Sequence, residues 1–461
     1  MPDAARSEAE RFVPPAPVPP EKDPSTLILA LRMARSQIEG WPRALYEGEA
    51  WKPPLPGGPL FVTSHEAVKA VLHEQADIFS TGALFRRMMR PAWGRGILIA
   101  QGEDWRAQRR AASGAFRPAD MAKLAPFFAG AAERAVQRWT AAPGLPAVDM
   151  LREMIRLTFE VILETSFSGG ADFDRAEMAS AVERLVARIS RIRPSALLFP
   201  DRYHERRPSV RTPERHALLE MIRRMVARRR SAPPAGDLVD LLMTARDPET
   251  GEAFDDALLA DNLLGFILAA HETTALTLTW ALFLVASHTP TLDRLRREVE
   301  TVTGGVPVGP EHLPRLHFAR QVVSETLRLY PPAFLLTRVA GRETTIAGHR
   351  VRAGQRVNLP VYAIHRRAEI FPDPHAFDPD RFDSDRPQPD RYSYLPFGAG
   401  PRICLGASFA MAEAVTVLAT LIRAVDLQPV APERVWPVAQ LSLRPRGGMP
   451  MMVQRLEAAR G

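Results

Sequence analysis

The sequence contains a single cysteine, Cys404, in 461 residues. One thiol cannot form an internal disulfide, so the chain is not one of the small secreted proteins that disulfides stabilise. It also cannot hold an iron–sulfur cluster, which needs several cysteine ligands. A lone cysteine is most often a small buried apolar side chain, so any further role has to be argued from its sequence neighbours.

Lysine is scarce as well. It occurs only at Lys22, Lys52, Lys69 and Lys123, so 56 of the 60 basic residues are arginine. The arginines are spread along the whole chain, and the formal net charge of +7 therefore does not indicate a nucleic-acid partner. With 46% hydrophobic and 25% charged residues, the composition is that of a globular protein.

An apolar run of signal-peptide type is missing from the start of the chain. Residues 1–24 instead carry several prolines, which predicts a flexible Pro-rich arm ahead of a domain over residues 25–461. Residues 263–286 are apolar and long enough to span a membrane, but His271 and Glu272 lie in their middle. A charge at the centre of a membrane helix costs about 2.5–3.5 kcal/mol. We therefore expect a buried helix in a cytoplasmic protein without a membrane anchor.

Hydrophobic periodicity predicts a mainly α protein with a small β region. Helical patterns run from about residue 103 to 302, with breaks at 143–146, 169–170, 193–213 and 231–236. Strands are expected at residues 59–62, 344–346, 350–351 and 356–359, the second and third pairing across a turn. Residues 80–100 contain Gly82, Pro91, Gly94 and Gly96, and we expect a long loop there. We find no internal repeat and no Gly-rich phosphate loop after a strand.

The neighbours of Cys404 point to a metal-binding thiolate. Gly398 and Gly400 permit backbone conformations closed to other residues, and an Ala-rich helix pattern follows over residues 405–422. Cys404 would thus lie at a helix N-terminus, where the dipole favours the thiolate form that binds metals. Gly406 removes a side chain close to the thiol, so a flat macrocycle can lie near the backbone. Arg402 offers a cation for an acidic group beside it.

This segment, from Phe397 to Gly406, matches Phe-x-x-Gly-x-Arg-x-Cys-x-Gly at every fixed position and so resembles the haem-binding signature of the cytochrome P450 family. The resemblance implies a single-domain cytochrome P450 fold over nearly the whole chain. It implies haem b (iron protoporphyrin IX) as the cofactor, with the Cys404 thiolate as the iron ligand, which in this family favours O–O cleavage.

Two further motifs follow the order of the family. Glu325 and Arg328 resemble its Glu-x-x-Arg pair, and Arg381 resembles the arginine that joins them. Alone, such a pair at i, i+3 would be a solvated surface bridge of little energetic value. With the resemblance, we expect a buried network that supports the fold near the haem and takes no part in chemistry.

The segment from Ala269 to Thr274 lies inside the long apolar helix and resembles the family's oxygen-activation motif. The small side chains of Ala269 and Ala270 leave room for O2, although Ala270 stands where the family usually has Gly. Glu272 and Thr273 are the candidate catalytic residues, an acid and a hydroxyl that can relay protons. Thr273 can also bond to a carbonyl one turn earlier. We expect a structural or solvent-facing role for His271, because no second His lies at ligand spacing.

The resemblance also implies groups that bind the haem carboxylates. Trp105 and Arg109 match a Trp-x-x-x-Arg helix motif, and their i, i+4 spacing places them on one stripe. Arg338 and Arg402 would complete the set, since buried carboxylates need hydrogen-bonded cationic partners. Trp105 is equally compatible with an ordinary core position.

The implied activity is a monooxygenase that activates O2 and hydroxylates or epoxidises an apolar small molecule such as a fatty acid, a terpenoid or an aromatic compound. Electrons would come from a separate ferredoxin or flavodoxin with its reductase, and we expect a monomer. Arg106 and Arg110 share a stripe where an acidic partner could dock, although both could equally be solvated. A peroxide-driven peroxygenase and a non-catalytic haem sensor or carrier are the alternatives. Pocket walls are expected from residues 80–100, 150–230 and 263–273, and from Phe334 and Leu335.

Overall fold

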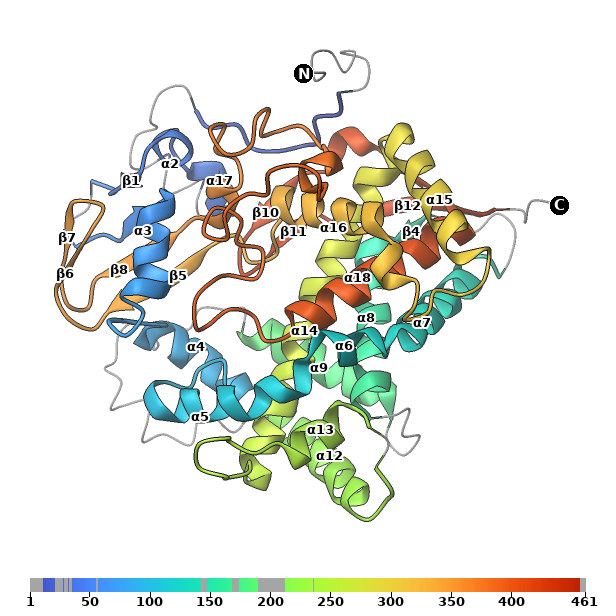
Figure 1. Ribbon diagram of the computed structural model, residues 1–461, viewed down its shortest axis with the longest axis horizontal. Helices are drawn as coiled ribbons and strands as arrows, with labels where there is room; N and C mark the ends of the chain where they lie inside the picture. The colour runs from blue at the N-terminus through green and yellow to red at the C-terminus, as the bar shows by residue number, and fades with distance from the viewer. Residues whose placement is uncertain are drawn as a thin grey trace.

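The computed structural model describes residues 11–20, 28, 32, 35–54, 57–141, 147–167, 174–189, 212–234 and 236–456. Its centre is one long helix, α14 (Asp256–Ala286), which runs through the molecule in Figure 1. The helix begins where the Asp255 side chain accepts a hydrogen bond from the Leu258 amide at 2.6 Å. It is apolar almost all round, so other helices cover it on most sides.

The remaining helices pack around α14, and α8 and α18 lie along it. The longer ones are α5 (Gly102–Ser113), α7 (Ala125–Trp139), α8 (Met150–Phe167), α9 (Arg175–Ile189), α12 (Pro213–Arg230), α15 (Thr289–Thr303), α16 (His317–Leu329) and α18 (Ala407–Ala424). The short ones are α2 (Ala44–Glu47), α3 (His65–Lys69), α6 (Pro118–Ala122), α13 (Leu238–Thr244) and α17 (Val361–Ile364). Among the helices that the structure describes, α14 and α18 are long and apolar enough to cross a membrane. However, 78% and 67% of their most apolar stretches are buried inside the protein.

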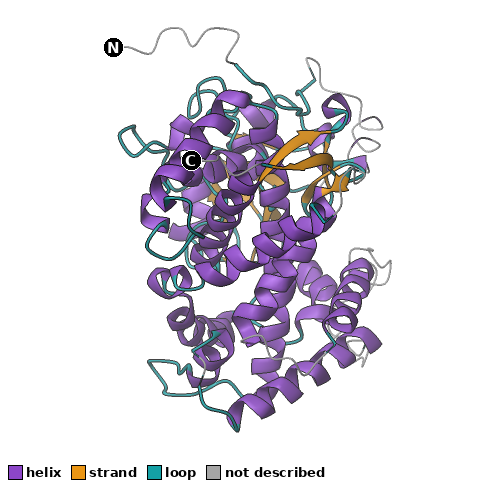
Figure 2. Ribbon diagram, turned by 90° about the vertical axis from the view of Figure 1, so that its right-hand side faces the viewer, coloured by secondary structure: helices purple, strands orange, loops and turns teal. Residues whose placement is uncertain are grey.

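The main sheet lies at the left of Figure 1, away from α7, α8 and α15, and other strands lie among the helices, as Figure 2 shows. The largest sheet has the order β1-β2-β8-β5-β3, from β1 (Ala50–Trp51), β2 (Leu60–Val62), β3 (Phe79–Ser80), β5 (Leu336–Ala340) and β8 (Arg356–Leu359). N-terminal strands thus pair with strands from the last third of the chain, and β2 runs parallel to β8. This confirms the expected small sheet region.

Three smaller β units complete the fold. β6 (Thr344–Ile346) pairs with β7 (His349–Val351), and the turn between them has positive φ at Ala347 and Gly348. This hairpin and β8 confirm the strands expected at residues 344–351 and 356–359. β4 (Val148–Asp149), β12 (Pro450–Arg455) and β9 (Val425–Pro429) form a three-stranded sheet. β10 (Pro437–Ala439) and β11 (Leu443–Pro445) form an antiparallel hairpin.

Residues 80–100 correct one expectation, because they contain the helix α4 (Ala83–Trp93) instead of a continuous loop. Pro91 lies inside the helix, and Gly82 and Gly94 flank it with positive φ. Met89, Ala92 and Trp93 are buried, and α4 packs against α14 and α9. This tertiary packing stabilises a helix that the Gly and Pro pattern alone argued against. Of the expected helix breaks, residues 143–146, 169–170 and most of 193–213 lie outside the described residues.

Residues 11–20 also differ from the expected flexible arm, because they lie against the fold. The Arg11 guanidinium pairs with Asp373 at 2.6 Å, and the Phe12 ring stacks on His288 with 5.9 Å between ring centroids. Farther along, the Pro15 carbonyl accepts a hydrogen bond of 2.7 Å from the Tyr330 hydroxyl. The prolines restrict this segment to an extended path, and side-chain contacts fix where it lies.

The pair of Glu325 and Arg328 is a buried network, as expected. Both side chains are fully buried, and the guanidinium makes two hydrogen bonds to the carboxylate at 2.6 and 2.7 Å. Arg328 also donates to backbone carbonyls of residues 365, 374 and 376, and Arg381 lies 3.5 Å from Glu325. Through the hydrogen bonds of Arg328 to these carbonyls, the network joins α16 to the loop that leads toward Cys404.

Candidate functional site

A tight loop precedes Cys404, and its backbone fixes the position of the thiol. The Cys404 amide donates a hydrogen bond of 2.9 Å to the Phe397 carbonyl. Gly398 and Gly400 have φ of 70° and 72°, which residues with a side chain rarely adopt. A Cβ on Gly400 would lie 1.8 Å from the Leu72 carbonyl oxygen. The loop therefore packs directly against the backbone of residue 72.

The electrostatics of Cys404 combine opposing effects. The thiol is accessible, yet the surrounding protein desolvates it and raises its pKa. A hydrogen bond from the Gly406 amide and the charge of Arg109 lower the pKa again, by a smaller amount. Helix α18 begins at Ala407 with Gly406 as its N-cap, so the predicted place at a helix N-terminus is confirmed. The net direction of the pKa shift nevertheless differs from the sequence argument, because desolvation outweighs the helix terminus.

The predicted arginines converge on this region from separate elements. Arg109 of α5 donates to the carbonyl of Ile403 at 2.9 Å, directly before Cys404. Arg402 donates to the Ala100 carbonyl at 2.9 Å, and its guanidinium lies 4.4 Å from the centroid of the Trp105 ring. Trp105 thus supports an arginine through a cation–π contact.

In the part of the chain that the structure describes, the arginines near Cys404 lack acidic partners. Desolvation lowers the pKa of Arg338 to about 10 and that of Arg402 to about 10, and the charges of Arg338 and Arg86 add to the second shift. Among the residues that the structure describes, neither Arg338, Arg402 nor Arg86 forms an ion pair with a carboxylate. Desolvated arginines without carboxylate partners fit a ligand with carboxylate groups. The sequence does not indicate Arg86, because the Gly and Pro residues of 80–100 predict a loop where the structure has α4.

The candidate residues of α14 lie on an accessible stretch of an otherwise buried helix. Ala269 and Thr273 are exposed and one turn apart, and the Thr273 hydroxyl donates to the Ala269 carbonyl at 2.9 Å. Ala270, which replaces the usual Gly, is half-buried against the apolar core. Near Cys404, a Cβ on Gly406 would meet no atom within 4 Å. There is therefore room beside both the thiol and the helix, as a flat macrocycle requires.

Glu272 and Thr273 are adjacent in sequence but bond to different partners. One carboxylate oxygen of Glu272 accepts hydrogen bonds from the Ser442 hydroxyl at 2.7 Å and from the Arg444 guanidinium. Both partners belong to the β10–β11 hairpin near the C-terminal end of the described chain. The sequence did not indicate this contact, because about 170 residues separate the partners.

Glu413 is a buried acid that no sequence motif indicates. It lies on α18, is 1% exposed, and both of its carboxyl oxygens lack a direct hydrogen-bond donor at standard geometry. Burial raises its pKa to about 8, and an interaction with the Thr274 hydroxyl opposes part of this shift. Thr274 follows Thr273 on α14, so a protonatable group lies close behind the candidate catalytic stretch.

His271 is structural, as expected. Its ring nitrogen Nδ1 lies 3.0 Å from the Ile267 carbonyl, and burial lowers its pKa. Among the described residues there is no group of three or more His, Cys, Asp and Glu that could hold a metal ion.

Arg106 and Arg110 do not form a free basic stripe. Arg106 pairs with Glu103 at 3.0 Å, while Arg110 pairs with Glu103, Asp247 and Glu249 at 2.9, 2.7 and 3.2 Å. Asp247 is almost fully buried, so Arg110 ties α5 to the loop before α14. The docking surface suggested by their spacing is therefore not supported.

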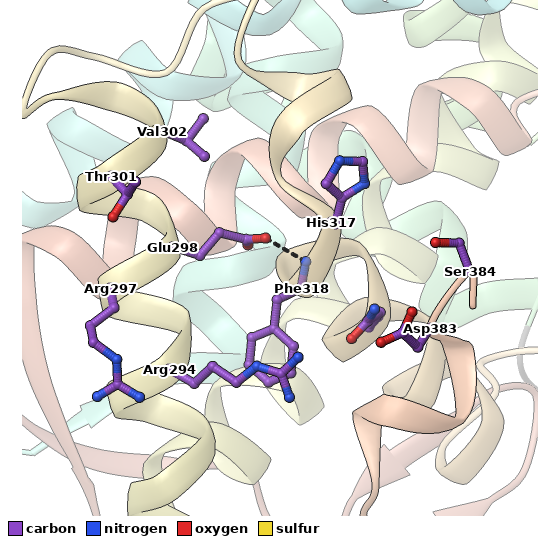
Figure 3. A pocket seen from close by; sticks show the side chains of 10 residues that line it. Arg294, Arg297, Glu298, Thr301, Val302, His317, Phe318, Asp383 and Ser384 are labelled. Carbon is purple, nitrogen blue, oxygen red and sulfur yellow. Dashed lines mark hydrogen bonds between the residues drawn. The ribbon is translucent and has the colours of Figure 1, made fainter. Parts of the chain in front are cut away.

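A cavity of about 500 Å³ lies between α15 and α16 (Figure 3). None of the predicted site residues lines it. Its central groups already have partners: Glu298 accepts hydrogen bonds from the Phe318 and Ala319 amides, and Arg294 pairs with Asp380. The Glu298 carboxylate thus satisfies the N-terminal amides of α16 in place of a local cap, which is a structural role.

Comparisons with known proteins agree with this site. The sequence model of the cytochrome P450 family matches residues 58–450. Cyclooctatin synthase of Streptomyces melanosporofaciens is 33% identical over 423 residues, which cover 90% of each chain. Cyclooctat-9-en-7-ol 5-monooxygenase of the same organism is 33% identical over 77% of each chain. A cytokinin hydroxylase of Arabidopsis thaliana is 31% identical over 86% of this chain and 79% of its own.

The fold agrees too. A crystal structure of a cytochrome P450, CYP102L1, superposes with a TM-score of 0.80 and 23% identity, over 96% of this chain and 100% of the other. The family model covers most of the chain, and the relatives include monooxygenases and hydroxylases that match most of its length. The chain therefore belongs to the cytochrome P450 family, whose members bind haem, and it is a monooxygenase.

Proposed function

We propose that Cys404 is the haem-iron ligand and that the enzyme hydroxylates or epoxidises an apolar small molecule. The observation that carries this proposal is the Cys404 loop. Its thiol is accessible, its amide is fixed by the Phe397 carbonyl at 2.9 Å, and space is free beside Gly406. Bound haem supplies the iron chemistry that activates O2 in this family.

The arginines would hold the two haem carboxylates. Arg338 and Arg402 are desolvated cations without carboxylate partners among the described residues, and each would gain charge-assisted hydrogen bonds from such a ligand. Arg109 lies close enough to affect the Cys404 thiol, and Trp105 supports Arg402. We add Arg86 to this set, because its charge already acts on Arg402.

Glu272 and Thr273 would move protons to the oxygen in the site. The Thr273 hydroxyl is accessible and can exchange its bond to the Ala269 carbonyl for a bond to a ligand. Glu272 is 15% exposed and has the solvent-accessible Arg444 beside it, so a proton from water can reach its carboxylate. This division gives Thr273 the contact with oxygen and Glu272 the contact with solvent.

The substrate would be a largely apolar molecule such as a fatty acid, a terpenoid or an aromatic compound. One relative is named for cyclooctat-9-en-7-ol, a skeleton with one double bond and one hydroxyl group, and another hydroxylates a cytokinin. Leu335 is half-buried and suits a pocket wall. Phe334 is 3% exposed and packs against Trp41, with 6.2 Å between the ring centroids. It would therefore support the pocket wall from the protein core.

Electrons would come from a separate ferredoxin or flavodoxin with its reductase, and the enzyme would act as a cytoplasmic monomer. The single cysteine leaves no ligand set for an iron–sulfur cluster in this chain. Burial of α14 and α18 inside the protein supports a location away from the membrane. Because Arg106 and Arg110 are neutralised by carboxylates, the partner would dock on other residues.

The ligand assignment is tested by the absorption spectrum of the reduced, CO-bound protein. Thiolate ligation gives a red-shifted Soret band, and Cys404→Ala should lose it. Ile403→Ala, at an exposed neighbouring position, should keep it. A Cys404→Ala protein that retains the red-shifted band would contradict the assignment. Turnover with peroxide alone, at the rate found with a ferredoxin and its reductase, would favour the peroxygenase alternative.

A further inference from the structure

Arg366, two residues after α17, is a cation in the protein interior. It is 2% exposed, and its guanidinium donates to the backbone carbonyls of Tyr362 at 3.3 Å and Leu329 at 2.6 Å. In the part of the chain that the structure describes, it forms no ion pair with a carboxylate, and the buried Glu325 pairs with Arg328 instead. A charge taken out of water is costly unless it is paired, so Arg366 calls for a negative charge nearby.

Three hydrogen-bond donors lie around the ring of Tyr362. They are the Arg366 Nε–H, the Tyr362 hydroxyl and the Trp41 indole N–H, and all three are buried without a hydrogen-bond partner among the described residues. The Arg366 guanidinium carbon lies 3.6 Å from the centroid of the Tyr362 ring, and the centroids of the Trp41 and Tyr362 rings are 6.3 Å apart. Buried donors in folded proteins nearly always have an acceptor, so this cluster calls for one.

The titratable groups around Arg366 do not supply the negative charge. Burial raises the pKa of the Tyr362 phenol, and it raises the pKa of Tyr46 and Tyr330 as well. The three phenols therefore stay neutral near neutral pH. Burial and the charge of Arg366 lower the pKa of His375 to about 4, as expected beside a cation that is not compensated.

We propose that the cluster of Arg366, Tyr362 and Trp41 binds one small monovalent anion, with the size and charge of chloride. The anion accepts hydrogen bonds from the Arg366 Nε–H and the Tyr362 hydroxyl, and the Trp41 indole is the third donor. These groups are suited to an anion, because guanidinium and indole N–H groups donate but never accept.

Neither water nor the protein itself does the same work. A water molecule accepts the same hydrogen bonds but leaves the Arg366 charge uncompensated. The face of the Tyr362 ring offsets part of that charge through its cation–π contact, yet it leaves the Nε–H without an acceptor. A single positive charge in a buried position favours an anion with one charge and few atoms.

The anion strengthens the junction between α16 and α17. Arg366 makes this junction, since it donates to Leu329, the last residue of α16, and to Tyr362 within α17. A ligand that binds the folded protein alone stabilises it in proportion to the logarithm of its concentration once the site fills. The stability of the holoenzyme should therefore rise with chloride at constant ionic strength.

The direct test is crystallography of the haem-loaded enzyme soaked in sodium bromide, with diffraction data collected at the bromine absorption edge. We expect an anomalous peak in contact with Arg366 and Tyr362. Density without an anomalous signal at this position would identify a water molecule. Bromide bound to exposed arginines alone would identify an adventitious ion only, and either of these two results would overturn the proposal.

Thermal unfolding of the holoenzyme gives a test in solution. Chloride is exchanged at constant ionic strength for gluconate, an anion too large for a buried site of this kind. We expect Tyr362→Phe to need about tenfold more chloride than the wild type for the same rise in the midpoint, the order expected when a charged group loses one hydrogen bond. Trp41→Phe should act in the same direction, and Arg366→Met should abolish the dependence on chloride.

Tyr394→Phe is the matched control, because the Tyr394 hydroxyl already donates to the Ser324 carbonyl at 2.8 Å and is not part of the cluster. It should keep the wild-type dependence on chloride, whatever its own midpoint. If Tyr362→Phe and Tyr394→Phe respond equally to chloride, the proposed site is wrong. Should Arg366→Met fail to fold, the comparison of these two tyrosine variants still decides.

Discussion

Gly400 is the residue whose replacement the Cys404 loop should tolerate least. Its φ of 72° strains any residue with a side chain, and a Cβ would overlap the Leu72 carbonyl oxygen at 1.8 Å. We expect Gly400→Ala to destabilise the holoenzyme by more than the 1–3 kcal/mol that backbone strain alone typically costs, as an order-of-magnitude figure. Chemical unfolding followed by circular dichroism measures this loss.

Gly354→Ala is the control for that prediction. Gly354 has φ of 80°, but a Cβ there would meet no atom within 4 Å, so only the backbone strain remains. Equal losses of stability in the two variants would show that the close approach to Leu72 is energetically unimportant.

Glu413 should make stability depend on pH in the opposite sense to most acids. Burial raises its pKa from 4.5 to about 8, so the folded protein favours the protonated carboxyl group. Its contribution to stability is fully present below about pH 4.5 and is lost as the pH rises through about 8. Glu413→Gln cannot ionise and should therefore gain stability relative to the wild type between pH 5.5 and pH 9.

The measurement is denaturant unfolding of both proteins at those two pH values. Glu433→Gln, at an exposed acid beside Arg434, should follow the wild type at both. A wild-type-like pH dependence in Glu413→Gln would mean that Glu413 is solvated or paired in solution.

At the residue scale, the sequence predicted the local motifs and missed their distant partners. Cys404, Gly398 and Gly400 lie in one short segment, so their spacing alone carried the inference. The partners of Glu272 come from a hairpin about 170 residues away, and no pattern around Glu272 indicates them. Glu413 was not predicted for a related reason, because an acid within an Ala-rich helix is ordinarily solvent-exposed and Glu413 is buried by the packing of α18 among other helices.

At the element scale, local turn chemistry gave accurate predictions and long-range packing did not. The sequence predicted the β6–β7 hairpin because Ala347 and Gly348 lie at its turn. Glycine adopts positive φ at little cost, so it favours such a turn. Helix α4 was missed because its stability comes from burying Met89 and Trp93 against other helices. The packing of residues 11–20 against the fold was not predicted either. Prolines indicate an extended segment but not the surface that it contacts, which here includes the His288 ring on which Phe12 stacks.

The contact between α5 and the loop before α14 depends on Arg110. Its guanidinium binds Asp247 at 2.7 Å through two nitrogens and lowers the pKa of that buried carboxyl to about 2. Arg110→Gln leaves the Asp247 carboxylate without its main partner, so we expect a clear fall in the midpoint of thermal unfolding. Arg106→Gln lies one turn away, and its pair among the described residues is the exposed Glu103, so this substitution should leave the midpoint nearly unchanged.

Reduction by a ferredoxin gives the matching kinetic test of these two arginines. Because both are neutralised by carboxylates, neither substitution should slow the first electron transfer at low salt. A slower rate in Arg106→Gln with normal thermal stability would restore the stripe as a docking surface.

At the scale of the whole molecule, the groups proposed to hold haem come from five separate parts of the chain. Arg86 belongs to α4, Arg109 to α5, Ala269 and Thr273 to α14, Arg338 to β5, and Cys404 to the loop before α18. These segments lie in different layers, the helices around α14 and the main sheet. A ligand that binds only the folded arrangement stabilises all of its contacts at once, so haem should act as a link between the layers.

Hydrogen exchange of the haem-free and haem-loaded proteins measures this link. On loading, we expect slower amide exchange together in residues 100–110, 266–274, 336–340 and 397–406, because local opening of any one of them would release part of the ligand. The β6–β7 hairpin, Thr344–Val351, contains none of the proposed haem contacts and should exchange at the same rate in both states. Slower exchange confined to residues 397–406 would support Cys404 as the ligand but contradict the roles given to Arg109 and Arg338. Equal slowing in the hairpin would instead mean that haem stabilises the whole fold cooperatively, without a localised link.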